Sequence, residues 1–69
     1  MRQDELDRIL NSAHREGHWG ILRISTFSDE DLIQVLDAIE REFSAVIHSV
    51  VYMGNNCENV RIYQIIYRV

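Results

Sequence analysis

The chain has 69 residues, so we expect one α+β domain over residues 1–69. Apolar residues make up 46% and charged residues 26% of the chain, which is typical of a globular protein and argues against a disordered one. The net charge of −4 argues against a uniformly basic nucleic-acid binder. No apolar run is long enough to span a membrane, and the single cysteine excludes an internal disulfide and fits a reducing cytoplasm.

The first predicted element is a helix over Asp4–Glu16. Its apolar residues recur at helical spacing and form one narrow stripe: Leu6, Ile9, Leu10 and Ala13. Gly17 is well placed to end this helix, because glycine readily adopts the left-handed conformation at that position.

The next segment, His18–Phe27, is predicted to be a strand. Leu22 and Ile24 share one face of it, and Trp19 and Ile21 share the other. Because both faces carry apolar side chains, we expect both to pack against something.

A second helix is predicted over Asp29–Phe43. Ser28 is a natural N-cap, and Asp31 has the spacing of a capping box. Phe27 and Leu32 have the spacing of a hydrophobic staple. The buried stripe of this helix is expected to be Leu32, Val35, Leu36, Ile39 and Phe43.

The last third is predicted to be a β-hairpin. Ala45–Met53 and Val60–Val69 are strand-like runs on either side of turn-forming residues 54–59. The element order is therefore α-β-α-β-β. A right-handed crossover with the last strand in the centre gives a three-stranded antiparallel sheet, a split β-α-β or ferredoxin-like half, with both helices on one face. Many unrelated functions use this arrangement, so it does not indicate one.

Alternate residues of each hairpin strand point to opposite faces of the sheet, and these two sets are called the two parities of the hairpin. The core beneath the helices is predicted to contain Leu22, Ile24, Ile47, Val51, Met53, Val60, Ile62 and Ile66. The bare face is predicted to be a protein interface made of Trp19, Ile21, Arg23, Val46, His48, Val50, Tyr52, Arg61, Tyr63, Ile65 and Tyr67. Exposed apolar patches with Trp, Tyr and Arg mark binding surfaces. The alternative is that the first helix crosses over and covers this face.

Acidic residues concentrate in the first part of the chain. Residues 1–42 contain ten acids and five arginines, whereas residues 43–69 contain one acid and two arginines. The second helix is predicted to expose an acidic surface of Asp29, Glu30, Asp37 and Glu40. Such a surface can imitate nucleic-acid phosphates or dock on a basic groove of a target.

Candidate catalytic and metal-binding residues are few. His14 and His18 have an i,i+4 spacing, but Gly17 lies between them, and Cys57 has no base beside it in the turn. We therefore expect no catalytic residue, metal or cofactor. The favoured function is a non-enzymatic protein–protein interaction module that forms a homodimer or binds an unknown protein target. On size alone, it compares with the small stoichiometric inhibitors or regulators of phages and mobile elements.

Two other functions use different residues. A single-stranded nucleic-acid platform would stack bases on the sheet through Tyr52, Tyr63, Tyr67, Arg23 and Arg61, although the net acidity opposes it. A small-ligand sensor, or an enzyme with a site between dimer subunits, would use His48, Tyr52, Tyr63 and Gln64.

Overall fold

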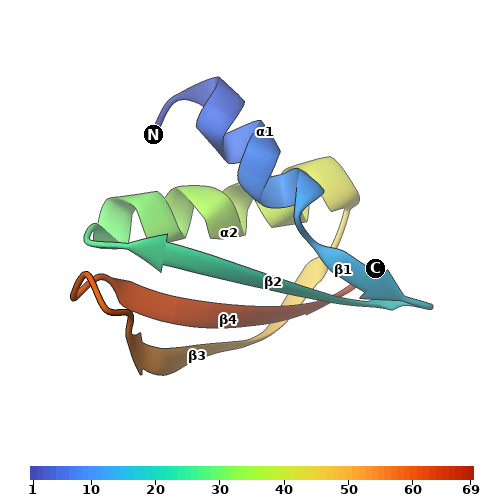
Figure 1. The fold of residues 1–69 in the computed structure, drawn as a ribbon. Helices are drawn as coiled ribbons and strands as arrows, with labels where there is room; N and C mark the ends of the chain where they lie inside the picture. Colours follow the sequence, from blue (N-terminus) through green and yellow to red (C-terminus); the bar gives the residue numbers. More distant parts are fainter.

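Two helices lie over one face of a four-stranded antiparallel sheet in the computed structural model, which describes residues 1–69 (Figure 1). The elements are α1 (Gln3–Asn11), β1 (His14–Glu16), β2 (Trp19–Thr26), α2 (Asp29–Phe43), β3 (Val46–Asn55) and β4 (Arg61–Arg68). The strand order is β1-β2-β4-β3. The α+β class is confirmed, and β4 lies between β2 and β3, antiparallel to both, as predicted. Neither helix is long and apolar enough to cross a membrane.

The fourth strand corrects the prediction of three. The first helix was expected to continue to Glu16, but it ends at Asn11, and residues His14–Glu16 pair with β2. Gly17 has a φ of +61° and opens the two-residue loop between β1 and β2 instead of ending a helix. All three β1 residues are polar and exposed, so the strand carries no apolar pattern for sequence analysis to detect.

The second helix begins and ends where it was predicted. Ser28 is its N-cap, and the Ser28 hydroxyl accepts a hydrogen bond of 3.3 Å from the backbone N–H of Asp31. The backbone N–H of Ser28 donates to Thr26 Oγ1 at 3.0 Å, so Thr26 takes the part expected of the Asp31 side chain. Phe27 is 72% exposed, so the proposed staple with Leu32 is not a buried contact.

Ser28→Ala is expected to lower the free energy of unfolding by about 0.5–2 kcal/mol, because it leaves an amide of the first helical turn without its acceptor. Urea denaturation measures the change. Ser25→Ala is the control, since Ser25 is exposed on β2 and makes no side-chain hydrogen bond. Equal midpoints and slopes for the two variants would contradict the capping role of Ser28.

The core lies between the helices and one face of the sheet. Both helices cover that same face, as predicted, because α1 contributes Leu6 and Leu10 to the cluster that α2 and the strands form. Its buried members are Leu6, Leu10, Leu22, Ile24, Val35, Ala38, Ile39, Ala45, Ile65 and Tyr67. The expectations for Leu22, Ile24 and Val60 as buried residues are confirmed, and Ile47 packs partly buried against the core.

A β-bulge in β3 reverses the predicted faces of the residues that follow it. Ile47 pairs with Tyr67 and Ser49 pairs with Ile66, so His48 is the extra residue. The alternation restarts after the bulge, and Val50 pairs with Ile65 on the helix side of the sheet. Val51 and Met53, which were predicted to be in the core, are therefore exposed.

The predicted faces of β4 are also wrong. Ile65 and Tyr67 were expected on the bare face, but both are 0% exposed beneath the helices. The reason is the register with β2, in which Leu22 pairs with Ile65 and Gly20 pairs with Tyr67. Gly20 leaves room for the large ring, and Phe43 of α2 stacks on it at a centroid distance of 5.5 Å. Ile62 and Ile66, expected in the core, lie on the other face, half-buried.

Candidate functional site

The sheet face that the helices leave uncovered is the candidate site, and we call it the open face. All four strands contribute to it, and the register and alternation of the strands define its members. These are His14 and Glu16 of β1; Trp19, Ile21, Arg23 and Ser25 of β2; Ile62, Gln64, Ile66 and Arg68 of β4; and Val46, His48, Ser49 and Val51 of β3.

One end of the open face is aromatic and carries two charged groups, Arg68 of β4 and Glu16 of β1. The ring of Trp19 meets the ring of His48 edge-on, with centroids 5.1 Å apart and an interplanar angle of 82°. The guanidinium of Arg68 lies 5.8 Å from the centroid of the Trp19 ring, within the range of a cation–π contact. These contacts hold Trp19 in place while leaving it 43% exposed. A large aromatic group held in this way is suited to anchoring a partner.

The centre of the open face is aliphatic. Ile21 pairs with Ile66 across β2 and β4, and Val46 and Val51 extend the apolar surface along β3. Ile21, Val46 and Val51 are all exposed, and Ile66 is half-buried. The apolar side chains of three strands thus form one surface that nothing in the chain covers.

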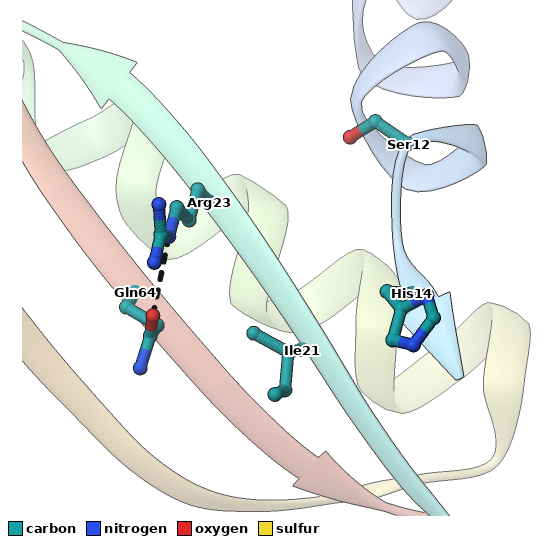
Figure 2. A pocket seen from close by; sticks show the side chains of 5 residues that line it. All are labelled: Ser12, His14, Ile21, Arg23 and Gln64. Atoms are coloured by element: carbon teal, nitrogen blue, oxygen red, sulfur yellow. Dashed lines mark hydrogen bonds between the residues drawn. The ribbon is translucent and has the colours of Figure 1, made fainter. Parts of the chain in front are cut away.

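A hollow of about 370 Å³ lies beside this aliphatic centre, and its lining residues are drawn in Figure 2. They are Ser12, His14, Ile21, Arg23 and Gln64. The Arg23 Nε–H donates to the Oε1 atom of Gln64 at 3.2 Å, which connects β2 to β4 across the face. No carboxylate of the chain lies within 4.0 Å of the Arg23 guanidinium. Arg23 is therefore available to an acidic group of a partner.

Five of the eleven predicted interface residues lie on the open face: Trp19, Ile21, Arg23, Val46 and His48. Another five lie on the helix side: Val50, Tyr52, Tyr63, Ile65 and Tyr67. Of this second group, Ile65 and Tyr67 are fully buried, whereas Val50 and Tyr52 stay exposed at the edge of β3. The predicted set thus assigned the wrong parity to β4 and to the second half of β3.

Arg61, the eleventh residue, also lies on the helix side. Its guanidinium forms an ion pair of 3.0 Å with Asp29 and donates a hydrogen bond of 2.6 Å to the carbonyl of Phe27. It also lies 5.8 Å from the centroid of the Tyr63 ring. Arg61 thus joins β4 to the start of α2, and it belongs to the internal structure rather than to the open face.

The predicted interface left out the β4 half of the open face. Its residues are Ile62, Gln64, Ile66 and Arg68, and Ser49 and Val51 of β3 were missed as well. The signal that would have found them is Gln64 with Arg68, because two polar residues at even spacing in an apolar strand mark its solvent side. Tyr63 and Tyr67 on the opposite parity of β4 hid that signal.

The residue sets of the two alternative functions do not come together. Arg23 lies on the open face, whereas Tyr52, Tyr63 and Tyr67 lie on the helix side, so these residues do not form one stacking platform. Likewise, His48 and Gln64 lie on one face of the sheet, and Tyr52 and Tyr63 lie on the other. Trp19 is the one aromatic residue of the β2 and β4 strands that faces outward.

The acidic residues are mostly on the helices. Nine acids and two arginines fall within α1 and α2, and two acids and five arginines fall outside them. Of the predicted acidic surface, Glu30, Asp37 and Glu40 are exposed on α2, and Asp29 is paired with Arg61. The two layers therefore carry opposite net charges, with the positive charge on the side of the sheet.

The remaining candidates for chemistry stay apart. His14 lies in β1 and His18 in the loop after it, and Cys57 is exposed in the turn between β3 and β4. No group of three or more His, Cys, Asp or Glu side chains is placed to hold a metal ion.

Fold and site together define a small α+β domain with an uncovered apolar sheet face. Comparison of the chain with protein-family models, with curated proteins and with solved structures found no match. The function is therefore inferred from the residues of the open face.

Tyr67→Phe is expected to raise the free energy of unfolding at neutral pH by about 1 kcal/mol, because the Tyr67 hydroxyl is buried without a hydrogen-bond partner in the chain. The variant should also be less sensitive to alkali. Burial raises the pKa of Tyr67, and the guanidinium of Arg15 opposes this less strongly. Folding therefore favours the neutral phenol. The resulting contribution to the free energy of unfolding is complete below the pKa of the unfolded chain, about 10, and is lost as the pH rises through the pKa of the folded protein.

Urea midpoints of the wild type and of Tyr67→Phe, measured from neutral pH to above pH 10, test both statements. Tyr63→Phe is the matched control, because Tyr63 is only partly buried. Parallel curves for all three proteins would contradict the burial of the Tyr67 hydroxyl.

Proposed function

We propose that this chain is a non-enzymatic protein-binding module that holds a segment of a target protein on its open face. The observation that supports the proposal is an exposed apolar surface built from three strands, with Trp19 at one end and Arg23 beside its aliphatic centre. A large exposed apolar surface lowers the solubility of a protein, and such surfaces mark the sites where proteins bind a partner. Aromatic and arginine side chains are also enriched among the residues that contribute most to binding energy.

The charges of the open face define the chemistry of the target segment. Arg23 and Arg68 are its cations and Glu16 is its one acid. A matching segment is apolar and has an acidic group that meets Arg23, whereas at the Trp19 end Glu16 lies in the same row as Arg68. The acidic helices lie on the opposite side, where they keep the complex soluble and repel acidic segments that approach from that side. This fits a small inhibitor or regulator that acts by stoichiometric binding.

A photo-crosslinking amino acid placed at Ser25, on the open face, tests the proposal in cells that produce the protein. We expect a crosslinked product with one partner protein, and we expect no such product from the same amino acid placed at Gln34, which is exposed on α2. Adding Ile21→Glu should abolish the Ser25 crosslink, because it places a carboxylate in the apolar centre of the face.

The competing hypothesis is that the target binds to the acidic surface of α2. In that case crosslinking would occur from Gln34 and not from Ser25. The Gln34 crosslink would also be lost in the variants Glu30→Arg and Asp37→Arg. It would weaken with salt, since exposed charges are screened beyond about 8–10 Å at ordinary ionic strength. That result would contradict the proposal.

A further inference from the structure

The outer edge of β3 has the hydrogen-bonding groups of a strand but no strand beside it. β3 is the last strand of the order β1-β2-β4-β3, and it is ten residues long. None of the hydrogen bonds outside the helices and strands uses a backbone group of β3. The backbone N–H and C=O groups that point away from β4 therefore have no partner in the chain. A second strand is the structure that satisfies such a row.

The two edges of the sheet differ in how they are protected. β1, at one edge, is three residues long and contains Arg15 and Glu16. Short length and charge are the usual devices that prevent a sheet edge from pairing with another chain. β3, at the other edge, is irregular at its two register shifts, but it contains no charged residue, and Val46, Val51 and Tyr52 are exposed along it.

We infer that β3 pairs antiparallel with β3 of a second copy of this chain, which joins the two sheets into one of eight strands. Ser49–Tyr52 is the regular stretch of β3 between its two register shifts, and it lies near the middle of the strand. A twofold axis at Val51 places Val51 beside its own copy and Val50 beside Tyr52 of the other copy. Such an interface is self-complementary, because neutral apolar and β-branched side chains meet one another without any repulsion between like charges.

Two further features favour a second copy as the occupant. A 69-residue domain buries only about 60% of its unfolded surface, so added burial is a large gain for it. Pairing at the edge also leaves the open face uncovered, because the twofold axis is perpendicular to the sheet and both helical layers stay on the same side. The dimer then presents two open faces next to each other to a target. That role in target binding rests on the proposed function, whereas the dimer itself does not.

The molar mass in solution, measured from low to high micromolar concentration, tests the inference. We expect the mass to approach twice 8.1 kDa as the concentration rises. Val50→Lys should raise the dissociation constant at least about tenfold, because it places an unpaired ammonium group in the seam. Tyr52→Lys is a second variant at a more exposed site, in case Val50→Lys folds poorly. Gln34→Lys on α2 adds the same charge away from the seam and should leave the constant unchanged.

Ile21→Lys distinguishes pairing at the edge from stacking of two open faces. Ile21 lies on β2, away from the seam, so the variant should remain a dimer while losing the Ser25 crosslink to a target. A dimer that Ile21→Lys dissociates, and that Val50→Lys and Tyr52→Lys leave intact, would overturn the inference. A wild-type chain that stays at 8.1 kDa at high micromolar concentration would overturn it as well.

Discussion

Ile65→Asp is expected to unfold the protein. Ile65 is 0% exposed between the sheet and the helices, where it pairs with both Leu22 and Val50. A carboxylate at this position has no partner, and leaving a buried charge uncompensated costs about 3–5 kcal/mol. A domain of this size has a free energy of unfolding near the lower end of the usual range of about 5–15 kcal/mol, so the variant would lose most of it.

Ile66→Asp is the matched control for this prediction. Ile66 is the next residue of β4, is half-buried, and points to the open face. The same substitution there should leave the protein folded and cost much less, because water reaches the carboxylate. Circular dichroism and urea denaturation of the two variants measure the difference. A folded Ile65→Asp protein together with an unfolded Ile66→Asp protein would reverse the assignment of the two faces.

Gly20→Ala is expected to cost about 3 kcal/mol, at the upper end of the usual penalty for overpacking. A Cβ atom at Gly20 would lie within 2.1–2.5 Å of three atoms of the Tyr67 side chain, so the ring would have to leave its place. That ring also stacks on Phe43, so the packing of α2 on the sheet would be lost with it. Urea denaturation of the variant gives the loss of stability.

A double-mutant cycle separates this clash from a general effect of alanine in β2. Tyr67→Leu alone should be destabilising, because it removes a large buried side chain. Gly20→Ala added to Tyr67→Leu should cost far less than it costs in the wild type, because the ring that it meets is absent. Additive losses would contradict the direct contact between Gly20 and Tyr67.

The parts of the fold that were predicted correctly depend on local patterns. The bounds of α2 follow from its capping residue and from the period of its apolar stripe, and both are properties of neighbouring residues. The central position of β4 follows from general rules for connecting strands across a helix. β1 was missed because its three residues are exposed and polar, and it exists only because β2 offers an edge with which it pairs.

The faces of the hairpin could not be derived from alternation alone. Both parities of β4 are apolar, so either of them can face a core. The large ring of Tyr67 fits the core because Gly20, 47 positions earlier in the chain, lies opposite it. The bulge at His48 then reverses the parity of β3, and a bulge leaves no periodic signal in a strand that has apolar residues on both parities.

By itself, the amino-acid sequence determined the class of the protein, its amphipathic second helix, the order of the three long strands and the existence of an uncovered apolar sheet face, because these follow from spacing and from the amount of apolar surface. The tertiary structure alone decided which side chains form that face. A shift of one residue in strand pairing exchanges the two faces, and the register here depends on contacts between distant residues, namely Gly20 with Tyr67 and Ile65 with Leu22. The same register moved Ile65 and Tyr67 into the core and brought Ile66, Gln64 and Arg68 to the surface.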